Sequence, residues 1–261
     1  MTIHQRLLPC IAAMLFSTEV LSHEFWIEPS AHQAAPGEEI QLLLKVGERF
    51  RGSAQPYLPN DFERFEHISS NATVPIEGLL GDSRPAARIL TAPGLNQIIH
   101  HTVPFDIQFP DGDARWADYV ALDGLADQLA AHPNLPQVTP VSERYVRSVK
   151  SLIVSGPMTP ADRLTGRLPY ELVLEGTLTA GSQSFRLYEA RSGKPGILIK
   201  AFRHSDRTVV DQAITDADGR VQLNLPSADR YLVSGVVIAP DSDPRFDWLS
   251  HWPALTLEIS D

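Results

Sequence analysis

The sequence predicts a mainly β protein with two β-sandwich-like domains and a short helix between them. Prolines are frequent: 21 of the 261 residues, about 8%, are proline, whereas about 5% is usual. They separate short apolar runs, as turns and edge strands do. Glycine is not raised with proline, which excludes a collagen-like chain. In addition, short strand-like runs follow one another at regular spacing beyond residue 168, as in a β-sandwich.

The first element, residues 1–22, is typical of a secretory signal peptide. Arg6 precedes an apolar run of about ten residues, roughly half the length that spans a bilayer, and a polar stretch then ends at Ser22. Cleavage between Ser22 and His23 would also remove Cys10, the only cysteine. We therefore expect a mature chain in the bacterial periplasm, without disulfides and without a transmembrane segment.

An N-terminal β-rich domain is expected over residues 23–160. Apolar runs between turn residues predict strands at 40–46, 74–76, 87–90 and 97–103. Residues 51–71 are polar and contain prolines, so they predict a long loop. A spacing of three or four predicts one short helix near 117–131. Residues 141–154 are ambiguous, because their apolar positions fit a helix early and a strand late.

The second domain is expected over residues 168–261, after a boundary at 156–169 that is rich in structure-breaking residues. The predicted strands of this domain are 171–175, 184–189, 197–202, 208–214, 221–225, 231–238 and 254–259. Asp-Ala-Asp-Gly at 216–219 predicts a hairpin turn. We expect this domain to fold by itself.

Charge and motifs exclude several classes of function. The net charge is −10 and no cluster of Lys or Arg occurs, whereas nucleic-acid binding requires a basic surface that neutralises phosphates. Nucleic acid is therefore excluded as a partner. No phosphate-binding glycine loop, Gly-x-Ser-x-Gly or His-Glu-x-x-His motif is present, so we do not expect an enzyme.

Several motifs are similar to those of one family. The most specific are His-Glu-Phe-Trp-Ile-Glu-Pro at 23–29 and Asp-Trp-Leu-Ser-His-Trp at 247–252, with Val-Gly-Glu-Arg-Phe at 46–50 and Glu-Arg-Tyr at 143–145 between them. The chain resembles the NikM-like proteins, a periplasmic family with a domain of unknown function that is associated with nickel and cobalt uptake. The resemblance implies transition-metal handling and a C-terminal domain like transthyretin or the carboxypeptidase regulatory module.

His23 is the leading candidate for a metal ligand. After cleavage it would offer a free α-amine, whose ordinary pKa is about 7.7–8.0, and an imidazole Nδ1 that can chelate the same metal. One more imidazole would complete a three-nitrogen site suited to Cu²⁺ or Ni²⁺. The alternative is that His23 caps the first strand or belongs to a frayed terminus.

His100 and His101 are candidates for that second imidazole. They lie in an apolar strand-like run, where neighbouring side chains point to opposite faces, so at most one of them can meet His23. The pattern does not choose between them, and the alternative is one core and one surface histidine. His251, in the aromatic cluster at 248–252, is a further candidate, with a structural role as the alternative.

Other polar residues carry weaker hypotheses. Asp241, Asp243 and Asp247 in one loop would suit a hard cation such as Ca²⁺, with a solvated acidic loop as the alternative. The isolated histidines are expected to be exposed at the surface: His32, His67, His132 and His204.

Three functional hypotheses follow from these residues. The leading one is a periplasmic protein that binds nickel, cobalt or copper through His23 and a strand histidine, and delivers it to a membrane transporter. The second is a non-metal module that binds a partner protein or a glycan. The third is a histidine-brace copper oxidase of polysaccharides, which requires a second brace histidine. The metal stays open, because nitrogen sites favour copper whatever their natural load.

Overall fold

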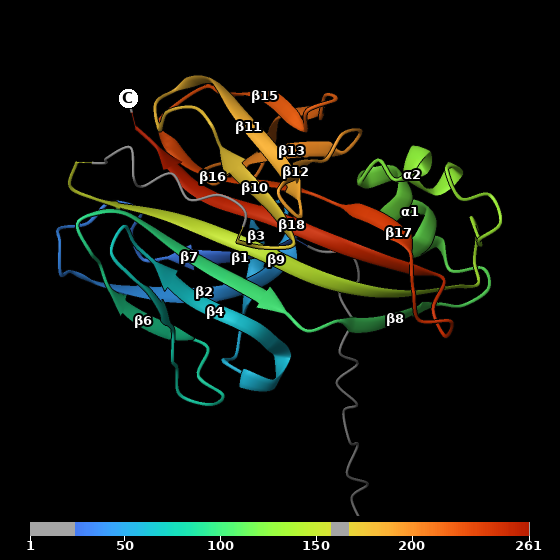
Figure 1. The fold of residues 1–261 in the computed structure, drawn as a ribbon, viewed down its shortest axis with the longest axis horizontal. Helices are drawn as coiled ribbons and strands as arrows, with labels where there is room; N and C mark the ends of the chain where they lie inside the picture. The colour runs from blue at the N-terminus through green and yellow to red at the C-terminus, as the bar shows by residue number, and fades with distance from the viewer. Residues whose placement is uncertain (1–23, 158–166, 261) are drawn as a thin grey trace, which may run out of the picture.

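The computed structural model describes residues 24–157 and 167–260, and it is mainly β, which confirms the predicted fold class (Figure 1). The signal peptide, His23 and part of the predicted domain boundary lie outside these residues. The strands of the first half are β1 Glu24–Pro29, β2 Glu39–Glu48, β3 Arg51–Gln55, β4 Phe62–Ile68, β5 Thr73–Pro75, β6 Ala87–Leu90, β7 Gly94–Thr102, β8 Phe105–Phe109 and β9 Val141–Ser155. Those of the second half are β10 Tyr170–Leu174, β11 Gly181–Glu189, β12 Ser192–Gly193, β13 Leu198–Arg203, β14 Val209–Ile214, β15 Arg220–Leu225, β16 Asp229–Gly235, β17 Val237–Pro240 and β18 Trp248–Ile259.

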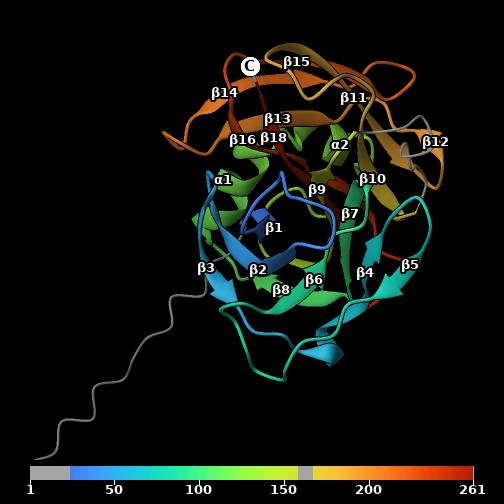
Figure 2. The ribbon, with the colours of Figure 1, turned by 90° about the vertical axis from the view of Figure 1, so that its left-hand side faces the viewer.

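These strands form three sheets in three layers. The N-terminal sheet has the order β1-β2-β3, with β6 beside β2, and the C-terminal sheet contains β10, β11, β12 and β15. A ten-stranded central sheet has the order β14-β13-β16-β18-β9-β7-β4-β5, with β17 beside β18 and β8 beside β9. Figure 1 shows the long strands β9 and β18 running between the two smaller sheets, and Figure 2 shows the N-terminal sheet curved beneath them.

Alternation along the strands lets one central sheet support two hydrophobic cores. In β9, Val149 and Ile153 pack in the core under the N-terminal sheet, whereas Leu152 packs in the core under the C-terminal sheet. In β18, Ala254 packs in the core under the N-terminal sheet and Leu255 packs in the core under the C-terminal sheet. Because successive side chains point to opposite faces, a strand covered on both sides is apolar without interruption. This explains why the sequence of β9 was ambiguous.

The predicted helix near 117–131 is present as two helices. They are α1, Ala114–Leu122, and α2, Ala126–Ala130, and they cover the end of the central sheet where β18 begins. Gly124 between them has a φ of +65°, and a Cβ there would lie 2.9 Å from the side chain of Leu198. The chain therefore turns at a position that favours glycine.

The loop predicted over residues 51–71 was wrong. This segment contains β3, a short 3₁₀ helix at Pro59–Asp61, and β4. In β3, a Cβ on Gly52 would lie 2.7 Å from the ring of Trp26, so the strand passes very close to the buried indole. Contacts between distant segments therefore specify β3, and its own apolar pattern does not.

The central sheet continues across the predicted domain boundary. The C-terminal strand β18 pairs in parallel with β9, from Trp248 beside Glu143 to Thr256 beside Ser151. The division into domains at 23–160 and 168–261 stays a prediction, but the two parts share one sheet. Within the described residues, no helix combines the length and the apolar character needed to cross a membrane.

Candidate functional site

His100 lies on the face of β7 that is covered by the N-terminal sheet. Its ring centroid lies 5.2 Å from that of Phe25, 5.0 Å from that of Phe62 and 5.1 Å from that of Phe65. The side chain is only 3% exposed, and neither ring nitrogen has a hydrogen-bond partner among the residues that the structure describes. A buried polar group without a partner costs about 1–3 kcal/mol of stability.

Burial also fixes the charge of this imidazole. Burial is the main cause that lowers the pKa of His100 to about 3, and unfavourable interactions with His101 and Arg147 contribute to the same shift. The ring is therefore neutral at physiological pH. A neutral imidazole is the form that coordinates metal ions, so His100 needs to release no proton before it can act as a ligand.

A cavity of about 230 Å³ opens beside His100, and we call it the His100 cavity. Phe25 of β1, Phe62 of β4 and Phe105 of β8 contribute to its wall, and the polar residues that line it are Gln55, Asp61, His100, Thr102 and Arg147. The cavity is small against the roughly 300–1,000 Å³ typical of drug-sized ligands, but several times larger than one water.

Arg147 of β9 lines the same cavity and lies close to two aromatic rings. Its guanidinium carbon lies 5.5 Å from the ring centroid of Phe25 and 4.8 Å from that of Tyr145. The backbone N–H of Arg147 donates to Oγ1 of Thr102 at 3.0 Å, which fixes the strand at this point. Its Nε is buried without a hydrogen-bond partner among the described residues.

The other two candidate histidines lie on the opposite face of the central sheet. Nδ1 of His101 lies 3.0 Å from Oγ of Ser148, and its Nε2 lies 3.7 Å from Glu63. His251 stacks on Tyr170 with a centroid distance of 4.3 Å, and burial lowers its pKa to about 4. Neither histidine therefore shares a face with His100.

A second cavity, of about 270 Å³, lies where β1, α1 and β13 meet. Glu24 lines it, and burial raises the pKa of this carboxyl to about 7, although the charge of Lys200 opposes the rise. Lys200 is paired with Asp123 at 2.5 Å and is held there. Glu24 and Phe25 thus contribute to two different cavities, as neighbours on a strand do.

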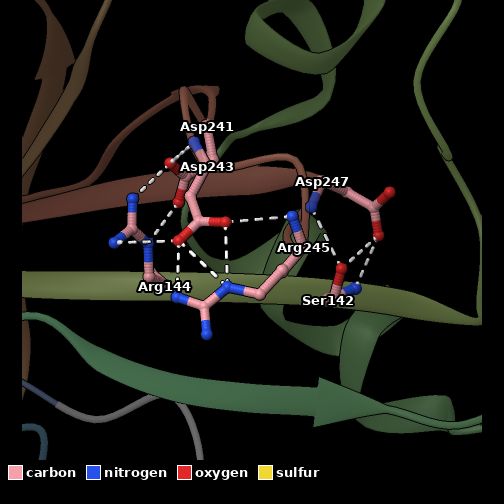
Figure 3. Close-up of polar contacts among 6 residues, drawn as sticks. All are labelled: Ser142, Arg144, Asp241, Asp243, Arg245 and Asp247. Carbon is pink, nitrogen blue, oxygen red and sulfur yellow. Dashed lines mark hydrogen bonds and ion pairs between the residues drawn. The ribbon is translucent and has the colours of Figure 1, made fainter.

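The acidic loop between β17 and β18 is held by basic and hydroxyl side chains (Figure 3). Asp241 accepts a hydrogen bond from Nε of Arg144 at 2.6 Å, and Asp243 accepts one from the guanidinium of Arg245 at 2.6 Å. Asp247 accepts hydrogen bonds from the backbone N–H and the hydroxyl of Ser142, at 2.8 and 2.6 Å. These pairs occupy the carboxylates that were considered for Ca²⁺, so the loop is an ion-paired one.

Two of the isolated histidines are buried, which corrects the expectation of surface positions. His32 is 2% exposed and its Nδ1 lies 2.7 Å from the carbonyl of Leu152. His67 is 8% exposed and its Nε2 lies 2.7 Å from Oδ1 of Asn96. Both rings serve as hydrogen-bonding groups inside the fold. Their polar sequence neighbours hid this, because contacts from distant segments bury them.

The described residues do not complete a metal site by themselves. In the ranges 24–157 and 167–260, no group of three His, Cys, Asp or Glu side chains is placed to hold a metal ion. A metal site at His100 would therefore need further ligands from outside the described residues. His23 is the candidate, because it precedes Phe25, a residue in contact with His100, by two positions in the sequence. Sequence reasoning missed Arg147, because no local pattern shows that an arginine lacks an acidic partner.

The comparisons with known proteins give one family. A family model described as "Domain of unknown function (DUF4198)" matches residues 20–238, and no curated protein matches. Among solved structures, the D0-D1 domain of Intimin aligns with 90% of this chain and 97% of its own, at 12% identity and a TM-score of 0.23. Beta-glucuronidase 3 of Bacteroides uniformis aligns with 91% of this chain and 25% of its own, at the same identity and TM-score. Such TM-scores carry no argument about function.

Proposed function

The chain belongs to the DUF4198 family, whose domain has no assigned function, and from this premise we propose that it is a periplasmic carrier of a divalent transition metal. The metal is its cargo, bound by His23 and His100, and a membrane transporter is its recipient. The proposal concerns binding and delivery, with no catalytic step. The resemblance to the NikM-like proteins favours nickel or cobalt.

The unpartnered imidazole of His100 is the observation that carries this proposal. Three phenylalanines surround a ring whose two nitrogens make no hydrogen bond with described residues, and a phenylalanine would fill such a place without the penalty for burying a polar group. A metal would supply the missing partner. The ring is also neutral and borders a cavity, which are two requirements of a ligand.

Strand geometry supports His23 as the residue that completes the site. Residues two apart on a strand share a face, and Phe25 contacts His100. His23 precedes Phe25 by two residues in the sequence, which is the spacing of residues that share a face of a strand. Its α-amine and Nδ1, with one nitrogen of His100, make a three-nitrogen donor set for Ni²⁺, Co²⁺ or Cu²⁺.

Calorimetric titration with Ni²⁺ and Cu²⁺ tests the proposal. The mature chain that begins at His23 is compared with a chain that carries one extra residue before His23, with His100→Phe and with the matched control His101→Phe. Loss of one of three ligands should lower the affinity at least about tenfold in the first two variants and leave the control near wild type. Because the α-amine must lose its proton, the affinity should rise between pH 6 and 8.

The same proteins show which result contradicts the proposal. Equal affinities for the mature and extended chains would exclude the terminal amine, and unchanged binding by His100→Phe would exclude His100. Urea unfolding of His100→Phe separates a lost ligand from a lost fold. We expect this variant to be at least as stable as wild type, because an unpartnered polar ring is replaced by an apolar one.

A further inference from the structure

Arg147 differs from the other arginine on the same strand in having no acidic partner. Arg144, three residues earlier, pairs with Asp241 and also lies 3.9 Å from Asp243. Arg147 has no carboxylate within 4 Å among the described residues, although Asp61 lines the same cavity. Burial lowers the pKa of Arg147, and only the hydrogen bond and charge of Tyr145 oppose this effect, but the guanidinium remains charged.

The surroundings of Arg147 are those of a binding group with an open position. The rings of Phe25 and Tyr145 lie within 5.5 Å of its guanidinium carbon, Tyr145 also takes a hydrogen bond from it, and its Nε is left without a partner among the described residues. A guanidinium held in this way matches a carboxylate, which accepts two parallel N–H···O bonds. The His100 cavity is where such an anion would lie, because both Arg147 and His100 line it.

We propose that the His100 cavity takes its metal as a complex with a small carboxylate chelator, with Arg147 binding a carboxylate and His100 binding the metal. The inference rests on the proposed metal-carrier function. The cavity, at about 230 Å³, is several times the volume of one water, which suits a small organic acid better than a large ligand. Each of the two groups has a different role. Arg147 is a cation without a nearby carboxylate and would bind the anion, whereas His100 is a neutral nitrogen donor without a hydrogen-bond partner among the described residues and would bind the metal.

Titration with citrate as the chelator tests this, using the mature chain that begins at His23. The titration compares four ligands: nickel alone, nickel with citrate, nickel with tricarballylate, and citrate alone. Tricarballylate has the same three carboxylates but lacks the hydroxyl that helps citrate to chelate. We expect nickel–citrate to bind at least about tenfold more tightly than nickel alone, and one citrate per protein to be retained after desalting.

Variants at Arg147 assign the carboxylate contact. Arg147→Met keeps an apolar stem at this position and removes the charge, so it should weaken the binding of nickel–citrate about tenfold and leave the binding of nickel alone within about twofold. Arg88→Met, at an exposed arginine of β6, is the matched control and should change neither. Far-UV circular dichroism of both variants checks that the fold is kept.

The outcomes separate the two proposals. If citrate competes for nickel, lowers the apparent affinity and is not retained, the inference is overturned while the metal-carrier function stands. Equal nickel–citrate affinities for wild type and Arg147→Met would also overturn it. If wild type binds neither nickel nor nickel–citrate, the carrier function itself fails, and the inference fails with it.

Discussion

Glu143 shows at the scale of one residue how burial controls charge. This carboxyl lies in β9 under the helices, is 2% exposed, and accepts hydrogen bonds from the hydroxyls of Tyr119, at 3.2 Å, and Ser250. Burial raises its pKa to about 7, although both hydrogen bonds favour the charged form. Its second oxygen has no partner among the described residues. In the folded state the protonated form is therefore favoured below about pH 7.

This raised pKa predicts a specific dependence of stability on pH. Between pH 4.5 and about 7 the folded protein holds a proton on Glu143 that the unfolded chain has lost, so this group's contribution to stability falls as the pH rises. Relative to Glu143→Gln, wild type should lose up to about 3 kcal/mol between pH 4.5 and 7.5. Urea unfolding of both proteins across this range measures the difference, in which the other titrating groups cancel. Parallel curves would contradict the prediction.

At the scale of elements, a buried ion pair joins the central sheet to the C-terminal sheet. Nζ of Lys150 in β9 lies 2.6 Å from Oε1 of Glu171 in β10, and the side chains are 3% and 1% exposed. The backbone N–H of Arg167 donates to the same carboxylate at 2.9 Å. Burial alone would raise the pKa of Glu171, but the charge and hydrogen bond of Lys150 outweigh it and hold the pKa below its ordinary value.

Removing one member of this pair should destabilise the protein far more than removing both. Lys150→Met leaves a buried carboxylate without its cation and should cost about 3–5 kcal/mol. The double variant Lys150→Met with Glu171→Leu should recover most of that loss, because no charge is left buried. Urea unfolding of the two variants at pH 7 gives the comparison. A double variant as unstable as the single one would mean that packing at this junction matters more than charge.

The sequence predicted most elements where their apolar patterns were complete, and failed where tertiary contacts decide. Alternation identified the strand that contains His100 and His101 and required the two rings to face opposite ways, as they do. It did not choose the face, because β7 is buried on both sides. The polar strand β3 was missed because Trp26 and β2 hold it. The isolation of Arg147 depends on which acids the fold brings near, which one sequence does not show.

At the scale of the whole molecule, the three layers should unfold together. The central sheet supplies one wall of both cores, so loss of either smaller sheet exposes the apolar face beneath it. We expect tryptophan fluorescence, which includes the buried Trp26 of β1, and far-UV circular dichroism to give one coincident urea transition. Two separated transitions would favour two independent domains.

A fragment tests the same point from the other side. Residues 168–261 contain β18 but lack β9, its parallel neighbour along nine paired residues. We therefore expect this fragment alone to show no cooperative unfolding, in contrast to the expectation from sequence. The fragment 141–261, which restores β9, is the control. Cooperative unfolding of 168–261 would support the predicted boundary at 156–169.

The position of β18 has a consequence for how the chain folds. The last strand along the described chain lies between β16 and β9, in the interior of the ten-stranded sheet, and its partner β9 is about a hundred residues earlier. Closing so long a loop is slow, and until β18 arrives the two halves of the sheet end in unpaired edges. While the chain is being made, those edges would stay exposed until β18 is available to pair with β16 and β9, and chaperones that shield strand edges would act during that interval.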